Sequence, residues 1–260
     1  TVSKKKRNYD YYSPGGKMGN RPDRAVIVYC NRIREAYGDV PIIIGGLEAS
    51  LRRFAHYDYW SDSVMQSILT ESGADMLVYG MGERPTWDIL DRLSKHIPFH
   101  KIRDVRGTCV AINGDEVESF RQKGAIIIPS FEEVTKDKMK YAKAFRLQEI
   151  NTDAFNADAL IQKQANGKYV LQNKPAFPLS EEEMDEIYAL PYERTWHPMY
   201  DEEGGIKSIE EVKFSINFKS SSCSSKSFGS KTIILLATVS KSSPASCLIL
   251  SIDIPPSVSI

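Results

Sequence analysis

The sequence predicts an α/β fold built on a parallel, Rossmann-like sheet. Between residues 25 and 96, apolar runs typical of strands alternate with segments that carry apolar residues at helical spacing. Glycines directly follow two of the apolar runs, at the place where open α/β sheets bind ligands. The chain has 260 residues, 42% of them hydrophobic and 26% charged, which is typical of a globular protein with one large domain or two small ones.

In the first half of the chain, predicted strands alternate with predicted helices. Nearly continuous apolar runs predict buried parallel strands at residues 25–30, 41–46 and 74–80. Helical spacing of apolar residues predicts the intervening helices at residues 31–39, 63–73 and 83–96. In the last of these helices we expect the inward-facing side chains to be Trp87, Leu90 and Leu93.

In the second half the alternation loosens. Strands are predicted at residues 108–112 and 125–130, followed by a long charged helix over residues 131–147. Two strand-like runs flank Asn166 and Gly167, which is a strong hairpin signal. Ser180 and Glu183 form a capping box at the start of a further helix. The alternating segment EEVKFSI, residues 210–216, predicts one more strand.

The chain therefore divides into three parts: a Rossmann-like domain with helical and hairpin extensions (1–205), a segment holding the last strand (206–217), and a tail (218–260). The tail has fourteen serines in 43 residues, no Glu, no Arg and a single Asp. Three interpretations stay open for it: a disordered tail, a low-complexity linker, or a product of translation in the wrong reading frame.

Charge and cysteine content limit the classes of function that the chain can have. The 34 Lys and Arg residues balance 34 Asp and Glu residues, so composition indicates binding to neither nucleic acid nor membranes. The spacing of the four cysteines matches no zinc or disulfide pattern, and no signal peptide is present, so we expect a cytoplasmic protein. The chain does not begin with Met, which suggests that its natural start lies upstream.

The densest group of candidate ligand-binding or interdomain residues lies in IIIGGLEASLRRFAHYDYWSD, residues 42–62. Glycines after a strand allow a ligand to approach the backbone, arginines can hold a phosphate or carboxylate, and aromatic rings can cover a planar group. Arg–Asp pairs and aromatic rings are also typical of domain interfaces. The candidates are Gly45, Gly46, Glu48, Arg52, Arg53, His56, Tyr57, Asp58, Tyr59, Trp60 and Asp62.

A second group follows the strand predicted at residues 74–80, where the sequence reads VYGMGERP. Its candidates are Gly80, Gly82 and Glu83. Glu83 could accept hydrogen bonds from a ligand, or it could simply suit the positive end of the helix that begins there.

The two groups are expected to meet along one edge of the sheet, because the carboxyl ends of parallel strands share an edge. Arg52 and Arg53 would then form ion pairs with nearby acidic side chains, or would remain available to bind an anionic ligand. The acids concerned are Asp58, Asp62 and Glu83. The edge should carry partly exposed aromatic rings, those of Tyr57, Tyr59 and Trp60.

Three stretches carry a resemblance to a known family: RPDRAVIVYCNRIREAYGDVPIIIGGLEASLRRFAHYDYWSD, ADMLVYGMGERP and PYERTWHPMYDEEGGIKSIEEVKFSI. They resemble the YgiQ-type radical S-adenosylmethionine family, over residue 1 to about residue 216. The resemblance implies an N-terminal domain, similar to cobalamin-binding domains, followed by the first strand of a radical S-adenosylmethionine barrel that this chain lacks. For the full-length family it implies a [4Fe–4S] cluster and S-adenosylmethionine.

In that family a C-x3-C-x2-C loop follows the strand and holds the cluster through three thiolates. The family register places the three ligand positions at Ser222, Lys226 and Gly229, and Cys223 lies one position away from the first. We therefore expect no metal ligand and no catalytic residue in this chain. Cobalamin is not expected either, because the D-x-H-x-x-G motif is absent.

The resemblance thus predicts the N-terminal fragment of a radical S-adenosylmethionine enzyme, of unknown substrate and inactive as given. Its expected partner is the missing barrel domain. The alternative is a standalone ligand-binding or structural interaction domain without catalysis.

Overall fold

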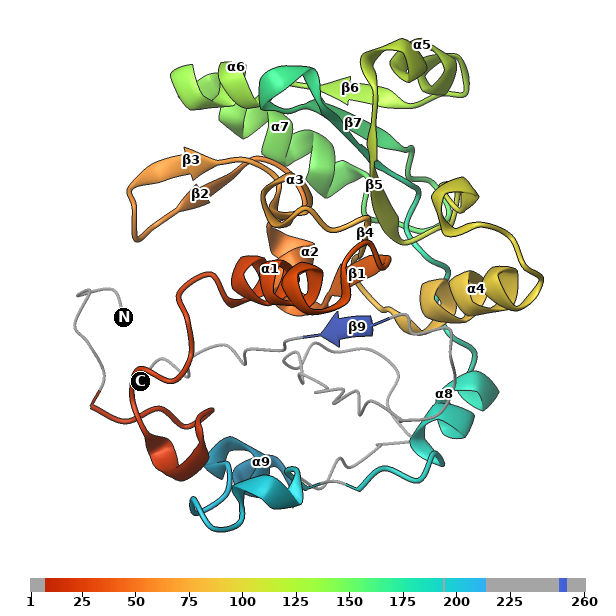
Figure 1. Cartoon of the computed structure of the whole chain (residues 1–260). Helices are drawn as coiled ribbons and strands as arrows, with labels where there is room; N and C mark the ends of the chain where they lie inside the picture. The colour runs from red at the N-terminus through yellow and green to blue at the C-terminus, as the bar shows by residue number, and fades with distance from the viewer. Residues whose placement is uncertain (1–7, 194, 214–247, 252–260) are drawn as a thin grey trace, which may run out of the picture.

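The computed structural model describes residues 8–193, 195–213 and 248–251 and has an α/β architecture. Within these residues seven strands form one sheet in the order β6-β7-β8-β5-β4-β1-β9 (Figure 1). The strands are β1 (Ile42–Gly45), β4 (Met76–Val78), β5 (Thr108–Ile112), β6 (Ile126–Ile128), β7 (Leu160–Lys163), β8 (Tyr169–Gln172) and β9 (Leu248–Ser251).

The sheet is mixed, so the prediction of a parallel sheet is wrong in part. β1 runs parallel to β4 and β9, and β6 runs parallel to β7. The pairs β4–β5, β5–β8 and β7–β8 are antiparallel. The predicted hairpin is confirmed as β7–β8 and lies between β6 and β5, which gives the antiparallel pairs β7–β8 and β5–β8. The third antiparallel pair, β4–β5, is independent of the hairpin.

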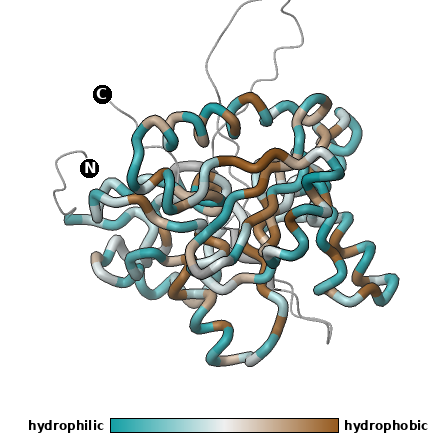
Figure 2. Tube along the Cα trace, turned by 90° about the horizontal axis from the view of Figure 1, so that it is seen from above, coloured by the Kyte–Doolittle hydropathy of each residue, from teal (hydrophilic) through white to brown (hydrophobic). Residues whose placement is uncertain are grey.

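Two apolar layers hold the sheet between helices. One face packs against α1 (Ala25–Tyr37), α3 (Ile68–Ser72) and α7 (Lys138–Ile150). The opposite face packs against α4 (Glu83–Ser94) and α5 (Gly114–Gln122). Within β1, Ile42 and Ile44 belong to the first layer and Ile43 to the second, as strand alternation requires. Seen from above, many apolar stretches run through the middle of the molecule (Figure 2).

Residues 25–30 are the first half of α1 and not a strand. The buried side chains of α1 are Val26, Cys30 and Ile33, which lie four and three residues apart and so form one face of a helix. A short apolar run does not by itself distinguish a buried strand from a buried helix. The helix predicted at residues 63–73 is also only partly correct, because β3 (Ser63–Met65) precedes the short α3.

The helix predicted at residues 83–96 is confirmed as α4, but its inward face is predicted correctly only in part. Leu93 packs against the core as expected, whereas Trp87 and Leu90 are exposed. The buried residues of α4 are Pro85 and Ile89. The long helix predicted at residues 131–147 is divided at Asp137 into α6 (Phe131–Lys136) and α7. The capping box of Ser180 and Glu183 is confirmed at the start of α8 (Glu181–Tyr188).

A small antiparallel hairpin lies beside the main sheet and follows α2 (Gly46–Leu51). Its strands are β2 (His56–Asp58) and β3. Single turns of 3-10 helix complete the described chain: η1 (Pro14–Gly16), η2 (Phe99–Lys101), η3 (Ala165–Gly167) and η4 (Pro198–Tyr200). None of the helices in the described ranges has the length and apolar character needed to cross a bilayer.

The first described residues pack against the last helix, α9 (Lys207–Lys213). The Ser208 N–H donates to the Tyr11 carbonyl at 3.0 Å, and the Gly15 N–H donates to the Gly205 carbonyl at 3.0 Å. Where the sequence predicts a strand over residues 210–216, the structure has α9 up to Lys213, and residues 214–216 lie outside the described ranges. Of the predicted tail, only residues 248–251 are described, as β9.

Candidate functional site

The two glycine loops meet at the carboxyl ends of β1 and β4, as expected from the parallel pairing of these strands. The Gly80 N–H donates to Ser50 Oγ at 3.1 Å, which joins the loop after β4 to α2. Gly46 and Gly80 adopt positive φ angles of 81° and 70°, where a side chain would introduce strain. A Cβ added at Gly45 would lie 3.5 Å from the Val78 carbonyl oxygen, an ordinary contact.

The loop after β4 leads directly into α4. Gly82 is the N-cap residue of α4, and Glu83 is the first residue of the helix, where the helix dipole favours a negative charge. One carboxylate oxygen of Glu83, Oε2, is buried and makes no hydrogen bond within the described residues. A buried acceptor of this kind could take a donor from a ligand or from another domain.

The arginines do not pair with the acids that the sequence suggested. Arg52 Nη1 donates to Glu48 Oε1 at 2.8 Å, one turn earlier in α2. Arg53 turns toward the sheet, where its Nε donates to Gln172 Oε1 at 2.6 Å and its Nη1 donates to the Ser50 carbonyl at 2.5 Å. The guanidinium of Arg53 also lies 5.2 Å from the ring centre of Tyr79.

The acids have other partners as well. Asp58 Oδ2 accepts from the Ser61 hydroxyl at 2.6 Å and lies 4.0 Å from Arg24 Nη2. The hydrogen bond from Ser61 holds the pKa of Asp58 below its usual value. Asp62 accepts a hydrogen bond from the hydroxyl of Tyr57, and this bond raises the pKa of Tyr57.

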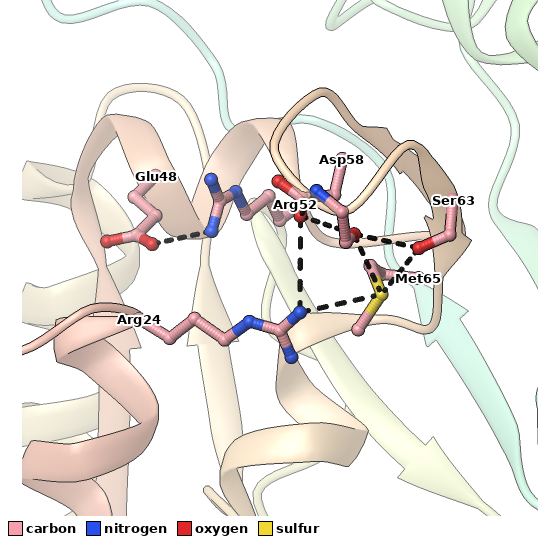
Figure 3. Close-up of polar contacts among 7 residues, drawn as sticks. Arg24, Glu48, Arg52, Asp58, Ser63 and Met65 are labelled. Carbon is pink, nitrogen blue, oxygen red and sulfur yellow. Dashed lines mark hydrogen bonds and ion pairs between the residues drawn. The ribbon is translucent and has the colours of Figure 1, made fainter. Parts of the chain in front are cut away.

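Arg24 and Arg52 line a small polar cavity, of about 10 Å³, between α1, α3, the end of α2 and the hairpin. Figure 3 shows the polar contacts of the two arginines at this place. A volume of this size holds about one water molecule. Glu71 lines the cavity as well, and burial raises its pKa. The cavity is therefore too small for an organic ligand, and its charged groups connect the elements that line it. Three of its lining residues, Arg24, Met65 and Glu71, were not among the candidates from the sequence.

His56 lies between this cavity and a larger groove, and it lines both. Its Nδ1 lies 3.1 Å from the Phe54 carbonyl oxygen, which can only accept, so Nδ1 carries the proton. Burial lowers the pKa of His56, although the Phe54 carbonyl partly opposes this shift. The imidazole is therefore neutral at pH 7, with Nε2 as a hydrogen-bond acceptor.

The hairpin carries the exposed aromatic side chains that the sequence predicted. The exposed fractions are 48% for Tyr57, 45% for Tyr59 and 59% for Trp60. The hairpin lies beside α6 and α7 and does not cover the glycine loops (Figure 1). The Tyr57 N–H donates to the hydroxyl oxygen of Tyr141 in α7 at 3.1 Å. The predicted residues thus form two neighbouring surfaces, the glycine edge and the aromatic hairpin.

The described cysteines do not suit an iron–sulfur cluster. Cys30 and Cys109 are buried free thiols, and burial raises the pKa of Cys30 and raises that of Cys109 to about 12. Cluster ligands must be thiolates, which these environments disfavour. No three His, Cys, Asp or Glu side chains in the described part of the chain come together as a metal site. Cys223 and Cys247 lie outside the described residues.

Comparison with known proteins identifies the family. A family model described as "Radical SAM N-terminal" matches residues 1–215. A UPF0313 protein of Clostridium botulinum (strain Okra / Type B1) is 57% identical over 216 residues, which are 83% of this chain and 33% of the relative. A UPF0313 protein of Clostridium perfringens (strain ATCC 13124) is 55% identical over 217 residues, 83% of this chain and 32% of the relative.

The chain thus spans about a third of the length of the curated relatives it matches. No solved structure matches. The matched region contains α1, the β1 glycine loop, the hairpin and the loop before α4, so the elements that build both surfaces lie within the family match. The chain therefore belongs to the UPF0313, YgiQ-type radical S-adenosylmethionine family and represents its N-terminal region.

Proposed function

We propose that residues 1–215 serve as the N-terminal domain of a radical S-adenosylmethionine enzyme whose chemistry takes place on a separate barrel domain. The observation that carries this proposal is the family match over residues 1–215, combined with relatives about three times as long as the match. The [4Fe–4S] cluster and S-adenosylmethionine would bind the barrel. The chain alone would be inactive, in keeping with the buried, protonated thiols of Cys30 and Cys109.

The aromatic hairpin is our candidate for the surface that contacts the barrel. Tyr57, Tyr59 and Trp60 expose a large share of their apolar surface on one hairpin, and aromatic residues are enriched in the cores of protein interfaces. The neighbouring glycine edge, with the buried Glu83 Oε2, would lie toward the substrate side of the same contact. The enzyme would work in the cytoplasm.

A chimaeric protein tests the proposal. Residues 1–215 of this chain replace the matching segment of the C. botulinum relative, and formation of 5′-deoxyadenosine from S-adenosylmethionine is measured under reducing, anaerobic conditions. We expect the chimaera to retain the activity of the relative and the 260-residue chain to have none. A folded chimaera without activity, alongside an active relative, would contradict the domain assignment.

Two tryptophan variants of the chimaera test the contact surface. Trp60→Ala removes a ring from the hairpin, and Trp87→Ala removes an exposed ring from α4, where the exposed fraction is 77%. We expect Trp60→Ala to weaken the coupling between the two domains, seen as two separate thermal transitions in place of one, and Trp87→Ala to leave a single transition. Equal behaviour of the two variants would remove the hairpin from the interface.

We also propose that residues 218–260 result from a change of reading frame. The loss of acidic residues and Arg in the tail and the end of the family match at residue 215 support this proposal. The DNA near the codon for Asn217 tests it directly. A neighbouring frame that encodes C-x3-C-x2-C is the expected result, and its absence from both other frames would refute the proposal.

A further inference from the structure

A groove of about 330 Å³ runs between the end of α2 and the side of α7. Its volume falls at the lower end of the range for small-molecule sites, roughly 300–1,000 Å³. Leu51, Ala55 and Phe145 give it apolar walls, and Leu51 and Phe145 are strongly exposed. It is distinct from the glycine edge and from the small cavity around Arg24.

Arg53 lies in this groove, held in a fixed position. Its Nε and Nη1 are bound to a buried amide, that of Gln172, and to a backbone carbonyl, that of Ser50. Both partners are neutral, and Arg53 forms no ion pair with any carboxylate of the described residues. Its Nη2 makes no hydrogen bond within the same residues. The guanidinium is therefore held in a fixed orientation, and its Nη2 N–H groups remain available as donors. Among the described residues it has no carboxylate partner.

The other titratable groups of the groove leave this charge uncompensated. His56 is neutral at pH 7, because burial lowers its pKa. Glu149, the acid among the lining residues, is exposed and lies beyond ion-pair distance of Arg53. The Tyr141 hydroxyl already accepts the Tyr57 N–H, and its proton remains a donor toward an acceptor in the groove.

We propose that this groove binds a small organic carboxylate with a planar apolar body. The carboxylate accepts hydrogen bonds from Nη2 of Arg53, since guanidinium groups match carboxylates in geometry and charge. The apolar body lies against Phe145 and Leu51, which it covers from water. The neutral acceptors that fix Arg53 orient the guanidinium without cancelling its charge. The site lies wholly within this chain and does not depend on the proposed barrel.

Indole-3-acetate is a suitable probe, and indole-3-acetamide is its neutral counterpart of nearly the same shape. Each is titrated into the full chain, uniformly labelled with ¹⁵N, and amide shifts are followed by NMR. We expect saturable shifts in residues 50–56 and 141–152 with the acetate. The acetamide should bind at least about tenfold more weakly, because a hydrogen-bonded charge commonly contributes that much.

Matched variants test whether the Arg53 guanidinium is the group that binds the carboxylate. Arg53→Gln is expected to weaken acetate binding about tenfold or more and to leave acetamide binding nearly unchanged. Arg52→Gln, which removes the same charge one residue away on a side chain that lines the other cavity, should have little effect. Glu149→Gln should leave acetate binding equal or slightly stronger, because it removes a negative charge from the groove wall.

The proposal is overturned if acetate and acetamide bind equally, if neither binds, or if the shifts map outside the two segments. It is also overturned if Arg52→Gln weakens acetate binding as much as Arg53→Gln. Should Arg53→Gln unfold the protein, the comparison of acetate with acetamide in the unaltered chain still decides the question.

Discussion

Arg52 and Arg53 are neighbours in the sequence, yet their side chains lie in different environments. Arg52 reaches back one helical turn to Glu48, an interaction that the spacing of four residues makes predictable. Arg53 binds Gln172, which lies 119 residues away in the sequence. A partner so distant depends on how β8 is placed in the sheet. The sequence therefore identifies the segment as rich in candidate ligand-binding residues. It does not distinguish Arg52, which is paired within its own helix, from Arg53, which we propose binds a ligand.

The sequence missed Arg24 and Gln172 for related reasons. Arg24 has a φ of 54° and precedes residues 25–30, which were predicted as a strand but form the start of α1. Because of this wrong prediction, its position beside Asp58 could not be expected from the sequence. Gln172 is fully buried, and nothing in a four-residue strand indicates which side chain will face an arginine. The glycines, in contrast, were correctly placed, because a glycine after a buried strand is a local signal.

Asp10 allows a prediction at this scale. Its carboxylate accepts hydrogen bonds from Arg21 Nε at 2.7 Å and Nη2 at 2.9 Å, and another from Ser13 Oγ at 2.8 Å. Burial opposes ionisation, but these donors outweigh it and lower the pKa of Asp10. Asp10→Asn should lower the free energy of unfolding at pH 7 by about 1–3 kcal/mol, measured by urea denaturation.

The pH dependence of that difference has a definite sign. A carboxyl group whose pKa is lower in the folded state stabilises the fold above its unfolded pKa, about 3.9 for Asp. The contribution is lost as the pH falls through the folded pKa. The variant and the unaltered chain should therefore converge in stability below about pH 4. Asp39→Asn, on a fully exposed side chain, is the control and should show almost no difference at any pH.

At the scale of elements, the predictions succeeded where a local signal marks a boundary. The capping box at Ser180 and the hairpin at Asn166 and Gly167 are such signals, and both elements are present. Residues 25–30 lack one, because an unbroken apolar run fits a strand or a buried helix face equally well. The long helix at residues 131–147 is interrupted at Asp137, whose side chain accepts the Met139 N–H and caps α7. An Asp before a helical run was available as a boundary signal.

Buried glutamines fasten the segment after α2 to the sheet and supply the second prediction. Gln162 is fully buried; its Oε1 accepts the Ala55 N–H at 2.7 Å, and its Nε2 donates to the Pro129 carbonyl at 2.9 Å. Gln162→Leu leaves both backbone groups buried without partners. We expect a loss of roughly 2–5 kcal/mol in the free energy of unfolding.

Gln122→Leu is the control for this substitution, because Gln122 is an exposed residue in the last turn of α5. It should change the free energy of unfolding by less than about 0.5 kcal/mol. Hydrogen exchange adds a second readout: in Gln162→Leu the amides of residues 53–58 should exchange faster, while those of α5 stay protected. Equal stability of the two glutamine variants would contradict the role assigned to Gln162.

At the scale of the whole molecule, the α/β class was predictable and the strand directions were not. Helices alternate with strands in the first half, which favours parallel pairs and gives β1 beside β4. The antiparallel pair β5–β8 comes from the placement of the β7–β8 hairpin beside β5, and β5 also runs antiparallel to β4; neither long-range pairing is encoded by a local pattern. The parallel pairing of β1 with β4 was predicted correctly, so the glycine loops meet at the ends of these two strands although the sheet is mixed.

Iron content after anaerobic reconstitution tests the central claim, that this chain is the N-terminal domain of an enzyme whose cluster lies on another domain. The 260-residue chain and the chimaera with the C. botulinum relative are treated side by side with iron and sulfide, desalted and assayed. We predict about four irons per molecule for the chimaera, as one [4Fe–4S] cluster requires, and no bound iron for the chain, which should remain colourless. About four irons in the chain alone, with charge-transfer absorption to match, would contradict the account.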